Sequence, residues 1–270
     1  MIAKLRIIRD SNRSASFNMA ADNLLVDKCS DDDNLITLRI YTWEKPSITI
    51  GCMQKAEEIL DLAAVKRDGV EWVRRPTGGR AVLHQNDLTY SCTFSKKNEA
   101  MGKTIAQTYR IITACIIKGF KRCAILCDAH DSYDEFRELK REIKLPCFLS
   151  PNRDEVMVGN RKLVGSAQKR TMYGVLQHGS TPIDSSYRRL PEYLLLDEHN
   201  RKLQKRLLER KSTCVDEVKP TITAEVLADC LVAGFCEGID AQIIHAGWST
   251  QELRNIALVA QREAPGVRVC

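Results

Sequence analysis

One loop decides how this chain is interpreted, and it reads Arg74-Arg75-Pro76-Thr77-Gly78-Gly79-Arg80-Ala81-Val82-Leu83-His84. It follows the β-rich run 70–74 and precedes a second β-rich run, so we expect a loop between two strands. Two adjacent glycines let the backbone approach a flat or anionic group, and arginines are suited to hold such a group. Alone, the loop also fits a tight turn whose arginines face water. A lone His84 is more often a packed or surface residue than a catalyst.

A second informative stretch contains Lys162. Two β-rich runs flank Gly159-Asn160, a two-residue connection of the kind that closes a β-hairpin. Alternation along the second run places Lys162 on one face with Val164 and Ser166. Close packing against this strand is indicated by its small residues, Gly165, Ser166 and Ala167. A lysine at its edge can orient a carbonyl or a phosphate and, if desolvated, take part in acid/base chemistry, although most lysines at strand ends are solvated.

Cys147 lies in a stretch framed by Pro146 and Pro151, which reads as an extended loop before the hairpin. A loop cysteine with cations nearby is better placed for reactivity than a cysteine on a regular apolar face. Because an unperturbed thiol is only about 3% thiolate at pH 7, a neighbouring Lys or Arg is required to activate it. One cysteine among 11 is not evidence by itself.

The remaining chain predicts one main domain of mixed secondary structure. Alternation of apolar and polar residues between Leu88 and Ser95 predicts a half-buried strand. Further short strands are expected at 35–41, 47–51, 123–127 and 175–183. Helices are expected at 14–28, from about 55 to a point before Gly69, and at 103–121, from 199 on, 223–236 and 249–262. The predicted fold class is α+β, with a largely antiparallel sheet flanked by helices.

Composition excludes several classes of protein. With 44% hydrophobic residues, 14 Gly and 8 Pro, the 270-residue chain is neither disordered nor collagen-like. No apolar run approaches the roughly 18 residues of a membrane helix, and the charged N-terminal segment is no export signal, so we expect a cytoplasmic protein with no membrane partner. The 11 cysteines show no CxxC pair or zinc spacing, which indicates reduced thiols and no metal site.

The basic surplus is concentrated in one stretch. Residues 137–211 carry 17 Lys and Arg against 9 Asp and Glu, although the whole chain has a net charge of only +6. Such a surplus can attract an acidic protein or nucleic acid, but a solvated basic surface is its commoner meaning.

Taken together, the motifs resemble the biotin/lipoate protein ligase and lipoyl/octanoyl transferase superfamily. The glycine loop continues into Asp87-Leu88-Thr89-Tyr90-Ser91, and the second block runs from Cys147-Phe148 through Arg161-Lys162-Leu163-Val164-Gly165-Ser166-Ala167-Gln168 to Leu176-Gln177-His178-Gly179-Ser180. The first helix and strand of the family are matched by Phe17-Asn18-Met19-Ala20 and Leu38-Arg39-Ile40-Tyr41. The resemblance covers residues 14 to 210. It implies a biotin/lipoate ligase-like (class II synthetase-like) catalytic domain over 1–220, with 221–270 as a helical extension packed on the same domain.

Within the superfamily, two features favour transfer over ligation. The Gly-Gly-Arg form of the loop and the cysteine in the Cys147-Phe148 block resemble the octanoyltransferases that acylate the glycine-cleavage H protein. ATP-dependent lipoate ligases commonly show three glycines and need no such cysteine. The chain departs from the usual pattern at Gln85-Asn86, where acidic residues are common, and by the extra Asn160 before Arg161-Lys162.

The resemblance implies a mechanism and partners. Cys147 would attack an octanoyl thioester of acyl carrier protein, and Lys162 would hold or activate the reacting groups. The acceptor would be a lysine of a lipoyl-domain protein such as the H protein, and the basic stretch would attract these acidic partners. Backbone N–H groups near the glycines are candidates to receive the oxyanion. Residues expected to bind the substrate are Arg75, Thr77, Gly78, Gly79, Arg80, His84, Gly165, Ser166, Ala167, His178 and Gly179.

Two other functions remain open. In an ATP-dependent lipoate-protein ligase, Lys162 would meet the lipoyl-AMP phosphate, and ATP and Mg would be required, whereas a transferase needs no cofactor. A non-catalytic module could instead bind lipoyl domains or nucleic acid through the basic stretch. Nucleic acid is disfavoured because aromatic residues are only 6% of the chain and do not interleave with the basic run.

Overall fold

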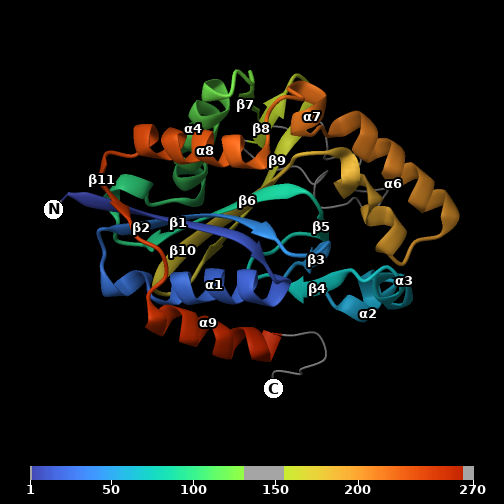
Figure 1. Cartoon of the computed structure of the whole chain (residues 1–270), viewed down its shortest axis with the longest axis horizontal. Helices are drawn as coiled ribbons and strands as arrows, with labels where there is room; N and C mark the ends of the chain where they lie inside the picture. Colours follow the sequence, from blue (N-terminus) through green and yellow to red (C-terminus); the bar gives the residue numbers. More distant parts are fainter. Residues whose placement is uncertain (1, 131–154, 264–270) are drawn as a thin grey trace.

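The protein is built around an eight-stranded mixed sheet that is covered by helices on both faces (Figure 1). A computed structural model describes residues 2–130 and 155–263. The strand order is β11 (Ala241–His245), β1 (Ala3–Arg13), β2 (Leu35–Trp43), β6 (Asp87–Ser95), β10 (Gly174–Pro182), β9 (Arg161–Arg170), β8 (Glu155–Val158) and β7 (Asp128–His130). All the pairings from β2 to β7 are antiparallel, whereas β1 is parallel to both β2 and β11. The predicted α+β class is confirmed.

Four helices form the outer layers (Figure 1). On one face lie α4 (Ile105–Arg122) and α8 (Ala224–Gly238), whose apolar residues share one core with the sheet. On the other face lie α1 (Ala15–Asp27) and α9 (Thr250–Glu263). Ile256 of α9 packs against Ala20 and Ala21 of α1. Because helices cover both faces, the central strands are buried on both sides.

A three-stranded sheet extends the molecule at one end (Figure 1). Its order is β4 (Glu71–Arg74), β3 (Ser47–Ile50) and β5 (Val82–His84). Ile48, Ile50 and Leu83 form a second core with Tyr193. The remaining α-helices of the described ranges are α2 (Ala56–Ile59), α3 (Leu62–Arg67), α6 (Glu198–Lys211) and α7 (Val215–Val218). Three 3₁₀ helices are also present in the described residues, namely η1 (Cys29–Asp31), η2 (Glu99–Met101) and η4 (Ser185–Tyr193). The glycine loop connects β4 to β5 within this small sheet.

Most of the predicted helices and the hairpin are confirmed. The Ser14 hydroxyl caps α1 by accepting from Phe17 N at 3.3 Å, and Thr104 forms a capping box with Gln107 at the start of α4. The other confirmed helices are α6, α8 and α9. The turn between β8 and β9 contains Gly159 with φ of 55°, as a two-residue connection requires.

Three local predictions are wrong. Strand β6 is buried at all nine positions, not half-buried, because it lies between β2 and β10 with helices on both faces. The strand expected at 123–127 is instead a turn that includes Ala124 at φ of 55°, and strand β7 begins only at Asp128. The helix expected from about 55 is divided into α2 and α3, because the Leu60 bridge to Leu194 interrupts it.

The sequence did not predict the edge strand β11 or its neighbour β1. Their parallel pairing joins segments near the two ends of the sequence, with Ala3 opposite Ala241. The boundary at 220 stays a prediction, although α8 and β11 beyond it share the core and the sheet with the preceding residues. Across 2–130 and 155–263, no helix combines the length and the hydropathy needed to cross a membrane. The cytoplasmic location stays a prediction.

An ion pair attaches the start of α9 to β1. Arg6 donates to both carboxylate oxygens of Glu252, at 2.7 and 2.9 Å, and Ser249 N donates to the same carboxylate at 2.8 Å. Partial burial would raise the pKa of Glu252, but the hydrogen bonds from Arg6 and Ser249 outweigh it and lower the pKa from 4.5 to about 2. The carboxylate therefore stabilises the fold when it is ionised.

We predict that Glu252→Gln lowers the free energy of unfolding by roughly 1–2 kcal/mol at pH 7. A lowered pKa gives a contribution that is complete above pH 4.5 and is lost as pH falls towards 2. Urea unfolding at several pH values should therefore show the difference between variant and wild type shrinking below pH 4.5. A difference that is constant from pH 7 to pH 3 would contradict this assignment.

Candidate active site

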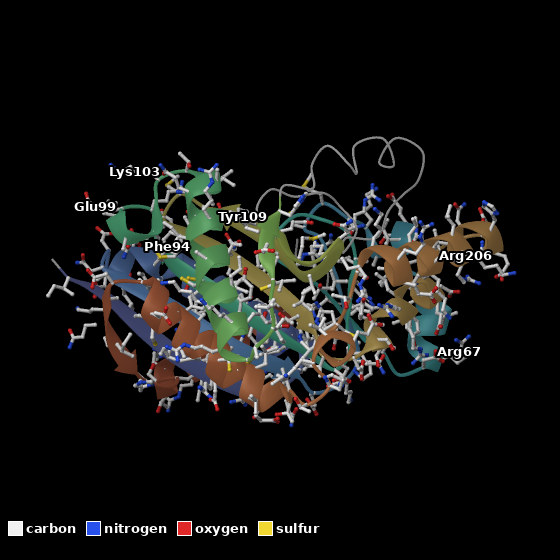
Figure 2. The ribbon with its side chains drawn as sticks, turned by 90° about the horizontal axis from the view of Figure 1, so that it is seen from above. Arg67, Phe94, Glu99, Lys103, Tyr109 and Arg206 are labelled. Atoms are coloured by element: carbon white, nitrogen blue, oxygen red, sulfur yellow. The ribbon has the colours of Figure 1, made fainter. Side chains whose placement is uncertain are left out.

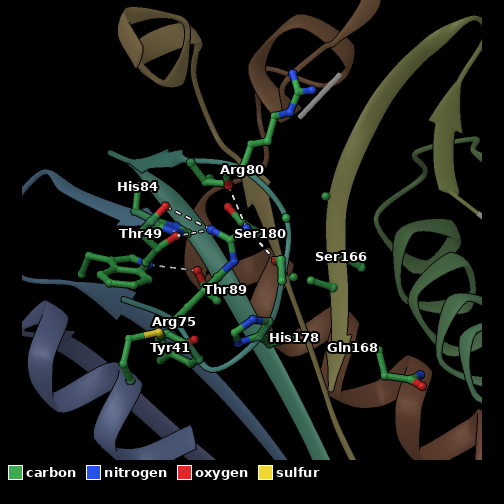
Figure 3. Close-up of a pocket in the computed structure, with 18 of the residues that line it drawn as sticks. Tyr41, Thr49, Arg75, Arg80, His84, Thr89, Ser166, Gln168, His178 and Ser180 are labelled. Atoms are coloured by element: carbon green, nitrogen blue, oxygen red, sulfur yellow. Dashed lines mark hydrogen bonds between the residues drawn. The ribbon is translucent and has the colours of Figure 1, made fainter. Parts of the chain in front are cut away.

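A cavity of about 370 Å³ lies where the glycine loop meets strands β9 and β10 (Figure 3). Its walls come from α1, β2, β3, the glycine loop, β5, β6, α4, β9 and β10. The lining residues are Met19, Tyr41, Trp43, Thr49, Arg75, Gly78, Gly79, Arg80, Val82, His84, Thr89, Tyr109, Lys162, Gly165, Ser166, Ala167, Gln168, His178, Gly179 and Ser180. The cavity thus combines aromatic and aliphatic side chains with polar and charged ones.

Arg75 holds the glycine loop from inside. Its side chain is 5% exposed and donates to the carbonyl oxygens of Gly78 at 2.9 Å and Arg80 at 2.7 Å (Figure 3). The other terminal nitrogen donates to Thr49 O on β3 at 3.0 Å. Gly79 has φ of 98°, a conformation that favours glycine. The guanidinium therefore shapes the loop through its backbone carbonyls, whereas the Arg80 side chain points away from this cluster (Figure 3).

His84 forms part of the wall and has both ring nitrogens in hydrogen bonds. Nδ1 lies 2.8 Å from Asp87 Oδ2, and Nε2 lies 2.9 Å from Thr49 Oγ1. The Trp43 ring stacks on the imidazole with 4.0 Å between centroids. Asp87 Oδ2 also accepts from Thr89 at 3.2 Å and from Ser180. These contacts orient His84 and Trp43 as a fixed surface of the cavity.

His178 connects the glycine loop to helix α1. Its Nε2 lies 2.7 Å from Thr77 Oγ1, and its Nδ1 lies 2.9 Å from Asp22 Oδ2. Burial would raise the pKa of Asp22, but the hydrogen bond from His178 and the positive charge of Arg39 lower it. The Asp22 carboxylate therefore stays charged and fixes the imidazole. Thr77 itself does not line the cavity but holds the loop through His178.

Strands β9 and β10 approach each other closely at the cavity. Gly179 lies opposite Ser166, and a Cβ at Gly179 would come within 2.6 Å of both Ser166 Oγ and Tyr90 Cε1. Ser166 Oγ lies 2.8 Å from the Tyr90 hydroxyl, and the Tyr109 hydroxyl donates to Ser166 O at 3.4 Å. The predicted close packing against this strand is confirmed at Gly179.

Lys162 is buried at the cavity, and its predicted face is wrong. A register shift places Val156 opposite Val164 but Met157 opposite Lys162. Opposite residues point to the same side of a sheet, whereas consecutive residues point to different sides. Lys162 therefore faces away from the side of Val164, because a β-bulge turns it over. Its exposure is 4%, and its Nζ lies 2.5 Å from Glu155 Oε1.

The structure brings most of the predicted site residues together. All the predicted residues on the described strands and loop line the cavity, except Thr77, which contacts His178. Cys147 lies outside the described residues, so its role stays a prediction. The sequence did not indicate a further nine lining residues, Met19, Tyr41, Trp43, Thr49, Val82, Thr89, Tyr109, Gln168 and Ser180. Tyr41 and Trp43 lie two positions apart on β2, so alternation indicates one face for both, but only the fold reveals which face meets the loop.

The described cysteines differ in their exposure. Nine are free thiols, and burial raises the pKa of Cys29, Cys115 and Cys127 to about 12, which keeps them protonated at neutral pH. Cys52 is exposed and lies beside the glycine loop, where its N–H donates to Thr77 O at 3.0 Å. Within the described ranges, no group of three His, Cys, Asp or Glu residues could hold a metal ion.

The sheet with helices on both faces and the cavity beside the glycine loop together define a catalytic domain of the lipoate ligase type. The family model of the lipoyl protein ligase A/B catalytic domain matches residues 14–236, and the chain belongs to this family. It is 37% identical to octanoyltransferase LipM of Geobacillus kaustophilus, over 83% of this chain and 82% of the relative. It is 34% identical to octanoyltransferase LipM of Anoxybacillus flavithermus, over 96% and 94%.

A solved structure has the same fold. The bi-partite lipoate protein ligase of Thermoplasma acidophilum, described with its E2 lipoyl domain, matches with a TM-score of 0.79 at 18% identity, over 100% of this chain and 99% of that one. The expected superfamily and the expectation of an octanoyltransferase are both confirmed.

We predict that Arg75→Lys loosens the glycine loop. A lysine cannot supply the planar donors that bind Gly78 O and Arg80 O together. Losing one or two such bonds should speed amide hydrogen exchange across residues 77–81 roughly tenfold, as followed by mass spectrometry. Arg80→Lys, which changes a side chain directed away from the cluster, is the matched control. Equal exchange in Arg75→Lys and wild type would show that Arg75 does not hold the loop.

Proposed function

We propose that this protein transfers an octanoyl group from acyl carrier protein, through a thioester on Cys147, to a lysine of a lipoyl-domain protein such as the glycine-cleavage H protein. The observation that carries the proposal is the cavity itself, where the glycine loop and the buried Lys162 meet an apolar wall. The relatives named octanoyltransferase LipM support the octanoyl group and protein lipoylation. The E2 lipoyl domain described with the Thermoplasma acidophilum ligase supports a lipoyl domain as the acceptor.

The reaction takes place in two acyl transfers. In the first, Cys147 sulfur attacks the thioester carbonyl, a new carbon–sulfur bond forms, and the carrier leaves as a thiol. In the second, the amine of the acceptor lysine attacks the acyl-enzyme, a carbon–nitrogen bond forms, and Cys147 is released. Thioester cleavage supplies the driving force for amide formation, so no ATP is consumed.

The apolar wall is suited to the acyl chain. Met19, Tyr41, Trp43 and Val82 line the cavity beside the polar loop. Burying about seven chain carbons at roughly 0.8 kcal/mol each contributes on the order of 5 kcal/mol. This is enough to select a medium chain over an acetyl group but does not separate octanoyl sharply from hexanoyl, because each methylene changes affinity only modestly.

Arg75 is engaged with the backbone of the glycine loop and of β3. Its terminal nitrogens donate to three backbone carbonyls of the loop and of β3. To bind an adenylate phosphate, the guanidinium would have to give up contacts that maintain the loop. We therefore place Arg75 in shaping the cavity, and propose that neither ATP nor Mg is required.

The first test is intact-mass analysis after incubation with octanoyl-acyl carrier protein and no ATP. We predict an octanoyl adduct that neutral hydroxylamine removes and that Cys147→Ala lacks. Cys52→Ala is the matched control, because Cys52 is the exposed cysteine beside the glycine loop and should not be needed. If lipoyl-domain acylation requires ATP and free lipoate and survives in Cys147→Ala, the protein is a ligase and the proposal is wrong.

The basic stretch gives a second prediction, which concerns partner encounter. On α6, Lys202, Lys205 and Arg206 are exposed, whereas Arg201 donates to Pro191 O and Leu196 O at 3.3 Å and so has a structural role. Figure 2 shows Arg206 at one end of the molecule and Lys103 at the other. An exposed positive surface raises the rate of encounter with acidic partners more than it raises affinity.

We expect Lys205→Glu/Arg206→Glu to slow octanoyl transfer from acyl carrier protein roughly tenfold at low salt, with the difference fading as ionic strength rises. Transfer rates measured at several salt concentrations test this expectation. Lys96→Glu/Lys103→Glu changes the net charge equally on a different surface and should have a smaller effect. If both double variants slow the reaction equally, net charge and not α6 is responsible.

A further inference from the structure

Two cysteine thiols meet where helices α4 and α8 pack on each other. Cys123 is the C-cap residue of α4, and Cys230 lies on α8. A side-chain hydrogen bond joins the two thiols. Cys123 is 5% exposed, whereas Cys230 is partly exposed and packs against the same apolar core. The pair therefore combines a buried sulfur with one that solvent can reach.

The antiparallel packing of the two helices places these cysteines opposite each other. Gly119 of α4 contacts Gly234 of α8 so closely that a Cβ at Gly234 would come within 2.7 Å of Gly119 Cα. One turn earlier on α4, Cys115 lies against Gly238, one turn later on α8. A step of four residues forward on α4 thus corresponds to four residues backward on α8, and it keeps the same helix face. The next such step reaches the two cysteines.

The end of α4 fixes the backbone of Cys123. The helix ends in a Schellman motif, in which Ile125 N donates to Phe120 O at 3.0 Å. Ala124 has the left-handed φ of 55° that this motif requires. The Cys123 thiol therefore keeps its place beside α8 with little freedom in its backbone.

Polar contacts hold the same two helices together from the solvent side. Arg122 donates to Glu237 Oε2 at 3.0 Å, and Lys118 donates to Glu237 O at 3.2 Å. Both donors belong to the last turns of α4, and Glu237 belongs to α8. Because the packing and these contacts set the separation of the helices, the thiols need mainly side-chain movement to bond. A disulfide forms readily only between residues whose backbones already lie close together.

We propose that Cys123 and Cys230 form a reversible disulfide when the protein meets a peroxide, which makes the pair a redox modification site separate from the active-site cavity. Neither residue lines the cavity. The bond would join the C-terminal end of α4 to α8. Helix α4 also supplies Tyr109 to the cavity wall, so the bond fixes one of the helices that build the site. The inference is independent of the proposed acyl transfer, because neither thiol takes part in it.

Cys230 is the residue that meets the oxidant first, because it is the more exposed of the two. Burial raises the pKa of Cys123 to about 12, which keeps that sulfur protonated and slow to react. Cys230 sulfur attacks one peroxide oxygen, the O–O bond breaks, and a sulfenic acid and water form. Cys123 sulfur then attacks Cys230 sulfur, the S–S bond forms, the S–O bond breaks, and a second water leaves. Two thiols and one hydrogen peroxide thus give one disulfide and two water molecules.

The test treats the full chain with hydrogen peroxide, blocks the remaining thiols by alkylation and maps cross-linked peptides by mass spectrometry without reduction. We expect a pair of peptides joined through Cys123 and Cys230, which dithiothreitol separates. Cys230→Ser should abolish this cross-link. The matched controls are Cys236→Ser on α8 and Cys127→Ser beyond the end of α4, which remove neighbouring thiols and should retain it.

Two further readouts test the order of reaction and the native origin of the bond. In Cys123→Ala, the Cys230 sulfenic acid has lost its partner and should be trapped by dimedone, whereas Cys230→Ser should leave Cys123 unlabelled. A disulfide that closes a loop of about a hundred residues should raise the Tm of oxidised wild type by roughly 5–15 °C. Dithiothreitol should reverse this rise, and Cys230→Ser should not show it.

Three results would overturn the inference. One is a wild-type chain whose thiols gain only oxygen adducts and form no cross-link between α4 and α8. Another is a cross-link that persists in Cys230→Ser or is lost equally in the two controls. The third is a cross-link that fails to raise the Tm, since this would place its formation in the unfolded chain. If circular dichroism shows that Cys123→Ala does not fold, Cys230→Ser and Cys236→Ser decide, because both replace partly exposed side chains.

Discussion

The active-site geometry depends on the buried ion pairs that the Arg39 guanidinium forms with Asp10 and Asp22. The Arg39 side chain is fully buried, with Nε 2.7 Å from Asp10 Oδ2 and Nη1 3.2 Å from Asp22 Oδ1. Asp10 also accepts from Trp248 Nε1 at 2.9 Å, so the cluster joins β1, β2, α1 and the segment before α9. Removing one member of such a cluster leaves a buried charge without its partner. The loss of folding free energy is then much larger than the net stability that the intact cluster contributes. Through Asp22, the cluster also fixes His178.

The glycine loop is consequently held from two sides. Arg75 binds its carbonyls from within the small sheet, and His178 binds Thr77 from the large sheet. Both contacts are hydrogen bonds made by buried side chains. The loop is therefore preorganised, and the cavity wall carries little of the ordering cost that a flexible loop would add to binding.

The sequence predicted those parts of the structure that depend on local chemistry. Helix caps such as Ser14 and Thr104, and the turn at Gly159, are determined by residues within a few positions of one another. The lining residues that the sequence did indicate occur in two short motifs, whereas others, such as Tyr41 and Tyr109, lie outside them. The sequence could not predict that His178 meets Asp22, 156 positions away, or that β6 is covered on both faces. The bulge that turns Lys162 towards Glu155 is likewise set by strand pairing and not by the alternation of residue types.

The parallel pairing of β1 with β11 has a consequence for biosynthesis. β1 is made before β11, the strand that covers its outer edge, which lies about 240 residues later in the chain. At roughly 5–20 residues per second, this edge waits on the order of 10–50 s for its partner on the ribosome. An unpaired strand edge can recruit other chains, and charged side chains such as Lys4 and Arg6 oppose this during the delay. The sheet is thus completed only after β11 has been made, and its long-range closure makes folding slow compared with that of its helices.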